Sequence, residues 1–422
     1  MPETINIDAL KADETSLRAR YQKFKNMGLR LDMTRGKPAP EQLDLANDMI
    51  NILSAKDYKD INGVDCRNYG GLDGLAEAKK LFADFLEVNT DEIIIGGNAS
   101  LNIMHDIIVR AITHGTCDSD TPWGKLNKIK FLCPAPGYDR HFAICEHFGI
   151  EMITIGLEDN GDPKMDEVQK LVANDDSIKG MWFVPKYGNP TGLSVSDATV
   201  DKLASMPTAA KDFRIMWDNA YTVHHLNDNH DKIKNLLEAC KANGNDNRAF
   251  IIGSTSKVSF AGAGVSMVGC SQANIAWLKS HLSIQTIGPD KLNQLRHIKF
   301  FKNMDGIKAH MQKHAAIIKP KFEKVLEILE NELGKKNIAK WSNPNGGYFI
   351  NFDVPNNCAK KVVAMASEAG VKLTGAGATF PYKKDPNDCN IRIAPTLPSI
   401  TEIAQAMEIV AICVQIAAIE NL

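Results

Sequence analysis

The chain has 422 residues, a hydrophobic fraction of 44% and a formal net charge of -2 at pH 7, which is ordinary for a globular protein of two domains. The slightly acidic balance argues against a nucleic-acid partner, because such binding needs a broad basic surface. The nine cysteines have no zinc-type or disulfide-type spacing, so we expect a cytoplasmic location and no metal site. The polar N-terminus does not resemble a secretory signal, and the apolar run at 409–419 is too short to span a bilayer, so we expect no membrane association.

Residues 1–30 predict one or two polar helices that form an N-terminal arm. The loop at 31–38 follows, and its glycine and proline mark it as irregular. It carries Arg35, Gly36 and Lys37, whose cations could face a carboxylate ligand. A plain surface loop is the default interpretation of this segment when it is taken alone.

A turn cluster at 68–74, which contains Tyr69, leads into a predicted helix at 75–85. A short strand at 92–95, a glycine-rich turn and a helix at 101–113 come next. The first amides of such a helix point at whatever lies before it, and the helix dipole favours negative charge there. Many α/β proteins contain such a turn, so this arrangement alone does not identify a ligand.

Polar residues follow the next predicted strands. These strands cover 128–132, 180–185 and 214–217, and the residues that follow them include Tyr138, Asn189, Asp218 and Tyr221. Strands alternate with helices from about residue 50 to 295, which predicts a wound, mostly parallel α/β sheet. Ligands of open sheets bind at the carboxyl ends of strands, so these side chains are candidates for one site.

The remaining sequence predicts long helices at 291–333 and then a smaller α+β domain with strands at 348–352 and 390–393. We therefore expect three parts. They are an N-terminal arm with part of the small domain (1–50), a large cofactor-binding domain (51–295), and an interdomain helix with the small C-terminal domain (296–422).

Lys257 is the most informative single residue. It follows a buried strand at 250–252, lies among small hydroxyl residues, and has no charged neighbour for several positions. Such a lysine could form a Schiff base with a carbonyl cofactor, and desolvation would lower its pKa. Ser254 and Ser256 could donate to a phosphate. A strand-end lysine that reaches solvent explains this stretch equally well.

Four short motifs taken together resemble the fold type I pyridoxal-phosphate enzymes, the aspartate aminotransferase superfamily. They are Asn-Pro-Thr-Gly at 189–192, Asp-Asn-Ala-Tyr at 218–221, Ser-Thr-Ser-Lys at 254–257 and Ile-Arg-Ile at 391–393. The resemblance spans nearly the whole chain. The segments at 34–38 and 288–297 resemble the divergent, MocR-like class of aspartate aminotransferases.

This resemblance implies a role for each candidate around the cofactor ring. Lys257 would hold pyridoxal 5'-phosphate and then move the substrate α-proton. Asp218 would pair with the pyridine nitrogen, so that the ring acts as an electron sink. Asn189 and Tyr221 would contact the phenolic oxygen of the ring, and Tyr138 would stack on its face.

The resemblance also implies groups for the phosphate and the substrate. The phosphate would be held by Asn98, Ala99, Ser100, Ser254 and Ser256, with Tyr69 and Thr286 reaching it from the partner subunit of a homodimer with shared active sites. Arg392 would grip the substrate α-carboxylate, and the backbone of Gly36 would approach it. The chain departs from many relatives at Val265, where they carry a phosphate-binding arginine.

The predicted function is an aminotransferase for aspartate, with 2-oxoglutarate as acceptor, so the substrates are an amino acid and a 2-oxo acid. A second carboxylate would need a second cation, and the candidates are Arg35, Lys37, Arg140 and Arg296, of which we favour Arg35. An aminotransferase for aromatic or other neutral amino acids is the alternative, ahead of a β-lyase or decarboxylase. A MocR-type regulatory binding protein is a third class, but the sequence has no basic helix-turn-helix segment.

Overall fold

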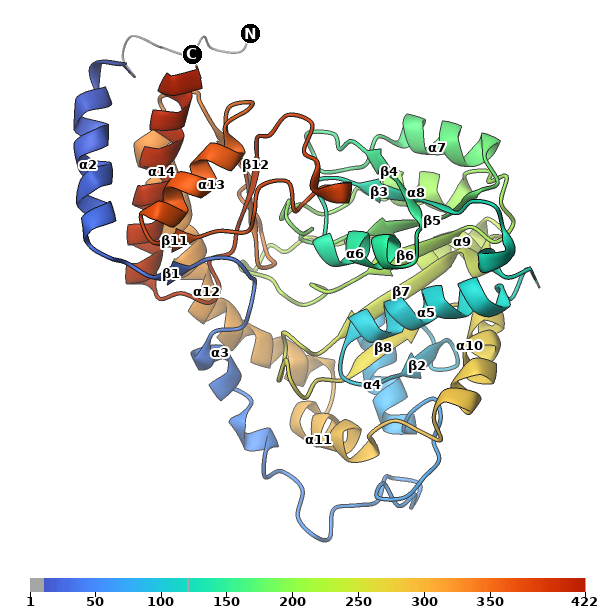
Figure 1. Cartoon of the computed structure of the whole chain (residues 1–422). Helices are drawn as coiled ribbons and strands as arrows, with labels where there is room; N and C mark the ends of the chain where they lie inside the picture. Colours follow the sequence, from blue (N-terminus) through green and yellow to red (C-terminus); the bar gives the residue numbers. More distant parts are fainter. Residues whose placement is uncertain (1–10, 120, 422) are drawn as a thin grey trace.

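A seven-stranded sheet dominates the computed structural model, which describes residues 11–119 and 121–421 (Figure 1). The strand order is β2-β8-β7-β6-β5-β3-β4. Its strands are β2 (Ile93–Ile95), β3 (Lys130–Pro134), β4 (Glu151–Ile155), β5 (Ile178–Phe183), β6 (Arg214–Asp218), β7 (Ala249–Ser254) and β8 (Ser266–Gly269). Neighbouring strands run parallel except at β8, which is antiparallel to both β2 and β7. The predicted mostly parallel, wound α/β sheet is confirmed.

Helices cover both faces of this sheet, because its strands are apolar on both sides. Successive residues of a strand point to opposite faces, and in β7 Ile251 joins one core while Phe250 and Ile252 join the other. The first core is closed by α4 (Ala76–Leu86), α7 (Met165–Asn174), α8 (Asp197–Ser205), α9 (Leu236–Ala242) and α11 (Lys291–Phe301). The second is closed by α5 (Ser100–His114), α6 (Asp139–His147) and α10 (Gln272–Gln285).

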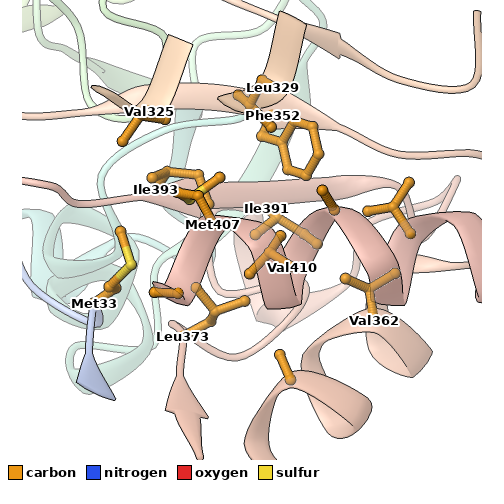
Figure 2. Close-up of a cluster of buried hydrophobic side chains, with 14 of the residues drawn as sticks. Met33, Val325, Leu329, Phe352, Val362, Leu373, Ile391, Ile393, Met407 and Val410 are labelled. Carbon is orange, nitrogen blue, oxygen red and sulfur yellow. The ribbon is translucent and has the colours of Figure 1, made fainter. Parts of the chain in front are cut away.

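A third core lies beside the large sheet and is built from both ends of the chain (Figures 1 and 2). Its helices are α2 (Glu14–Asn26), α13 (Ala359–Glu368) and α14 (Ile400–Asn421). Its strands are β1 (Leu31–Asp32), which pairs with β11 (Val371–Lys372), and the antiparallel set β9 (Lys340–Trp341), β10 (Ile350–Asp353) and β12 (Asn390–Ile393). By length and composition α14 could cross a membrane, but it is the central helix of this core, which explains its apolar sequence.

One long helix, α12 (Met304–Leu333), joins the cores. Ile307 packs in the first core, against the large sheet, whereas Phe322 and Leu329 pack in the third core. The short helix α3 (Pro40–Asp44) contacts α12 and connects the N-terminal segment to the rest. The domain limits after residues 50 and 295 stay a prediction.

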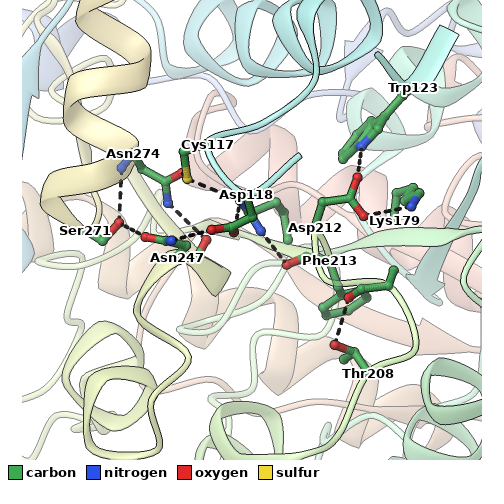
Figure 3. A network of polar contacts seen from close by, with 12 residues as sticks. Cys117, Asp118, Trp123, Lys179, Thr208, Asp212, Phe213, Asn247, Ser271 and Asn274 are labelled. Carbon is green, nitrogen blue, oxygen red and sulfur yellow. Dashed lines mark hydrogen bonds and ion pairs between the residues drawn. The ribbon is translucent and has the colours of Figure 1, made fainter. Parts of the chain in front are cut away.

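The amino ends of the parallel strands are held by fixed ion pairs (Figure 3). Lys179 of β5 donates to Asp212 at 2.7 Å, and the Trp123 indole donates to the other oxygen of Asp212, also at 2.7 Å. Arg214, the first residue of β6, donates to Asp118 at 2.6 Å. These cations are buried but paired, as buried charges must be. The polar residues at the opposite, carboxyl ends are therefore the ones left to form a site.

Candidate active site

A cavity of about 290 Å³ lies where the carboxyl ends of the sheet strands face the third core. Arg392 reaches it from β12, and Phe349 reaches it from the residue before β10. The predicted site residues that line it are Gly36, Arg35, Ser100, Tyr138, Asn189, Asp218, Tyr221, Lys257 and Arg392. Segments that are far apart in the sequence therefore converge on one cavity.

Lys257 is held by a rigid turn after β7. The Thr255 amide donates to the Val265 carbonyl and the Thr255 hydroxyl accepts from the Val265 amide, each at 2.8 Å. The Lys257 side chain is half-buried, its Nζ lies 4.9 Å from the centre of the Tyr221 ring, and among the described residues it has no ion-pair partner. Burial lowers the pKa of Lys257, although the charge of Asp218 opposes the shift. The neutral, nucleophilic amine is therefore easier to reach at Lys257 than at an exposed lysine.

Asp218 ends β6 and is almost completely buried. Its Oδ2 lies 3.0 Å from Nε2 of His141, while its Oδ1 is buried and has no hydrogen-bond partner in the described chain. A buried carboxylate oxygen without a donor is costly. The vacant acceptor and the negative charge suit a cationic ring N–H, such as that of a pyridinium.

His141 lies against Asp218, and the sequence reasoning missed it. Its ring stacks on Trp182 with the centroids 4.6 Å apart and the planes inclined by 12°, which fixes it against Asp218. It lies three residues after Tyr138, which is the N-cap of α6, and the two rings are in contact. That spacing was the available signal.

Two phenols stand beside Asp218. Burial raises the pKa of Tyr138 to about 12, and burial also raises the pKa of Tyr221 well above its usual range. Both groups therefore stay protonated at neutral pH and can donate to an anionic oxygen. The Tyr138 ring lies edge-on to His141, with the centroids 5.0 Å apart.

The phosphate residues predicted from within one chain lie close together at the start of α5. The Ser256 hydroxyl donates to the Asn98 carbonyl at 3.3 Å, and the Ser254 hydroxyl donates to Ser256 at 3.1 Å. Ala99 is the N-cap of α5 and Ser100 is its first residue, so the free amides of the helix face these hydroxyls. Val265 is buried in the first core and supplies no charge to the phosphate site.

Arg392 is a buried cation at the far side of the cavity. Its Nη1 donates to Asp139 at 2.9 Å and to Asn189 at 3.1 Å, its Nη2 donates to Thr374 at 3.3 Å, and its Nε has no partner in the described chain. The guanidinium lies 5.0 Å from the centre of the Phe349 ring.

Gly36 lies against the same aromatic ring. A Cβ at Gly36 would approach Cζ of Phe349 to 2.6 Å, so any larger residue would have to displace the Phe349 ring. The glycine therefore lets the loop backbone pass next to the Arg392 pocket.

Three of the four candidate cations for a second carboxylate line this cavity. They are Arg35, Lys37 and Arg140, all exposed at its mouth and without an ion-pair partner in the described part of the chain. Arg296 does not line the cavity of the single chain.

Tyr69 and Thr286 do not line the cavity of the single chain either. The Tyr69 side chain is 79% exposed. Lys291 donates to the Gly70 carbonyl at 2.7 Å, and Thr286 contacts the backbone of Gly288 at 3.1 Å. A Cβ at Gly288 would meet the Gly70 carbonyl oxygen at 2.3 Å, so the two segments lie side by side on the surface.

A buried polar chain lies behind Lys257 and was also missed. Gln42 donates to the Tyr348 hydroxyl at 3.0 Å and lies 3.0 Å from His314, which lies 3.0 Å from His310. His310 contacts the Val258 carbonyl at 2.8 Å. These contacts thus link α3, which contains Gln42, to the turn that carries Lys257.

Known proteins similar to this chain identify its family. The family model described as aspartate amino-transferase matches residues 5–422. The aspartate aminotransferase of Corynebacterium glutamicum is 45% identical over 405 residues, which are 96% of this chain and 93% of the relative. A crystal structure of an aspartate transaminase from the same species is 44% identical and superposes with a TM-score of 0.96 over 99% of this chain and 98% of that chain.

A more distant structure shares the fold. The α-aminoadipate aminotransferase from Thermus thermophilus, complexed with N-(5'-phosphopyridoxyl)-L-leucine, is 18% identical. It superposes with a TM-score of 0.75 over 95% of both chains.

Proposed function

Because the chain belongs to the aspartate aminotransferase family and is a transaminase, we propose that it uses pyridoxal phosphate to move the amino group of aspartate to 2-oxoglutarate. One observation carries the proposal. Lys257, Asp218 with its vacant Oδ1, and Arg392 surround one cavity of suitable size.

The residues present fit this cofactor. Asp218 would take the pyridine N–H on its free oxygen, and Lys257 would hold the carbonyl carbon. The start of α5 with Ser254 and Ser256 would take the phosphate. Once bound, the cofactor supplies an electron sink for the negative charge that develops at the substrate α-carbon.

A few side chains of the protein would carry out the rest of the reaction. Arg392 and Asn189 would orient the α-carboxylate, so that the α-hydrogen faces Lys257. The Lys257 amine, whose pKa burial lowers, would be released when the substrate amine replaces it on the cofactor carbon. It would then take the α-proton and return it to that cofactor carbon. His141, 3.0 Å from Asp218 Oδ2, would hold the Asp218 carboxylate in the correct orientation.

The distal carboxylate of aspartate would meet the cations at the cavity mouth. Transfer of this carboxylate out of water is costly without a counter-charge. Arg35 is our candidate partner, because it precedes Gly36, whose backbone lies against Phe349 beside Arg392. Lys37 and Arg140 line the same cavity and are the alternatives.

We further propose a homodimer in which Tyr69 and Thr286 of one subunit reach the phosphate site of the other. Tyr69 and the nearby Ile284 and Ile287 are large apolar side chains left 79%, 88% and 62% exposed in the single chain. Such a group of exposed apolar residues is typical of a subunit interface. All nine cysteines are free thiols, which supports the proposed cytoplasmic location.

A panel of amino donors tests the function. The holoenzyme is mixed in turn with aspartate, glutamate, alanine, phenylalanine and tyrosine, and the first half-reaction is followed by the cofactor absorbance. We expect the largest kcat/KM with the dicarboxylic donors. Preference for alanine or an aromatic donor would replace this proposal with the neutral or aromatic alternative.

A further inference from the structure

We propose that Asp139 is an internal substitute for the substrate α-carboxylate, which occupies Arg392 in the free enzyme and must leave when a carboxylate ligand binds. The inference rests on the proposed role of Arg392 and deepens it. It assigns to Asp139 a function in setting how tightly the site binds carboxylates.

The contact between Asp139 and Arg392 is the kind of contact that a bound substrate carboxylate would make with Arg392. Asp139 Oδ1 accepts from Arg392 Nη1 at 2.9 Å. The Arg392 side chain is only 6% exposed, whereas that of Asp139 is 37% exposed. The pair uses a single guanidinium nitrogen, and Arg392 Nε is left without a partner in the described chain. A substrate carboxylate could make the bidentate contact that Asp139 does not make, which is the stronger arrangement.

The ion pair also bridges two parts of the molecule. Asp139 is the first residue of α6 and belongs to the large sheet side, while Arg392 lies in the middle of β12 in the third core. Tyr138, the N-cap of α6, directly precedes Asp139, and His141 follows it in the first turn of the helix. The residues proposed to contact the cofactor and the substrate are therefore neighbours in sequence. A substrate carboxylate that binds Arg392 must therefore come to lie beside Asp139.

Two carboxylates at one guanidinium repel each other. The repulsion between like charges about 5 Å apart is substantial in a partly buried site. Asp139 can leave at modest cost, because it is already partly in water and because an acidic side chain in the first turn of a helix is stabilised by the helix dipole. Arg392 cannot leave, since a buried guanidinium without an anion is strongly unfavourable.

Asp139 would therefore do two things. In the free enzyme it keeps the buried cation paired and turned toward the cavity. In the presence of ligand it competes, so every carboxylate binds more weakly than Arg392 alone would permit. Anions that bind Arg392 weakly would be excluded, while a substrate with two well-placed carboxylates would still displace Asp139.

The test measures how tightly the holoenzyme binds succinate, a dicarboxylate without an amino group. Succinate is titrated into the holoenzyme at constant pH and ionic strength, and binding is followed by the cofactor absorbance. Asp139→Asn keeps the size and the neutral hydrogen bond but removes the charge. We expect its dissociation constant for succinate to fall about tenfold, which corresponds to ~1.4 kcal/mol. Glu146→Gln is the matched control, because it removes an exposed charge from the same helix outside the cavity. It should leave the dissociation constant unchanged.

Unchanged or weaker binding in Asp139→Asn would overturn the inference. If that variant does not fold, Asp139→Ser, which also removes the charge, is titrated and judged by the same criterion. Arg392→Ala separates the two proposals. Loss of succinate binding in Arg392→Ala, together with wild-type affinity in Asp139→Asn, would sink only the role of Asp139. Full succinate binding by Arg392→Ala would remove the proposed role of Arg392 and the inference with it.

Discussion

Asp218→Asn is the substitution that bears most directly on the chemistry of the site. It keeps the shape of the side chain and an oxygen for His141, but it removes the negative charge from a residue that is 2% exposed. The unpartnered Oδ1 would no longer stabilise a protonated ring nitrogen. Breaking one side of a buried charge pair costs about 3–5 kcal/mol. At ~1.4 kcal/mol per tenfold in rate, kcat should fall by roughly two to four orders of magnitude.

The assay is single-turnover transamination with saturating aspartate, followed by the cofactor absorbance, together with thermal unfolding of the same samples. Asp118→Asn is the matched control. It removes the same charge at the opposite end of β6, where Asp118 pairs with Arg214 at 2.6 Å, and it should lower stability without changing kcat. A kcat within a few-fold of wild type in Asp218→Asn would refute the assigned role of Asp218.

Three further predictions concern the mouth of the site, the buried histidines and the subunit interface. Arg35→Gln should raise the KM for aspartate by about tenfold or more and that for alanine far less; an equal rise for both in steady-state assays would mean that Arg35 only positions its loop. Burial lowers the pKa of His314 to about 3 in the folded chain, so the unfolded chain binds more protons below pH 6.5 and the free energy of unfolding falls as the pH drops from 7 toward 4. His314→Gln should make that fall shallower by about one proton in urea titrations, and an identical slope would argue against a neutral His314. Mixing inactive Lys257→Ala with a Tyr69→Ala variant of low activity should restore activity through hybrid dimers, and an active monomer by light scattering would exclude shared sites.

Much of the site could be predicted because the fold brings strand ends together. Asn189, Asp218 and Lys257 each follow a buried strand, and the carboxyl ends of parallel strands meet at one edge of a sheet. The short motifs that contain them are local in sequence. Local patterns are what sequence reasoning interprets best.

The contacts between distant segments could not be predicted in the same way. Nothing near Asp139 in the sequence indicates Arg392, which lies 253 residues later. The same holds for Gln42 and His314, which meet across 272 residues. These partners depend on how α6, β12 and α12 pack.

Short elements were also missed. β1 and β11 have two residues each, too few for any periodicity to show. The four residues of β8 follow a glycine-rich turn, and we assigned no strand there. Helices were predicted across 291–333, and they are divided at Lys302, which has a positive φ of 65°. The N-cap Asn303 then starts α12 by accepting from the Gly306 amide at 3.0 Å.

The central claim is that Lys257 carries the cofactor in this cavity, and chemical trapping tests it most directly. The holoenzyme is reduced with borohydride, digested, and searched by mass spectrometry for the lysine that bears the pyridoxyl group. We predict the label on Lys257 and none in Lys257→Ala, whereas Lys186→Ala, a buried lysine outside this cavity, should be labelled like wild type. A label on any other lysine of the unsubstituted enzyme would contradict the account.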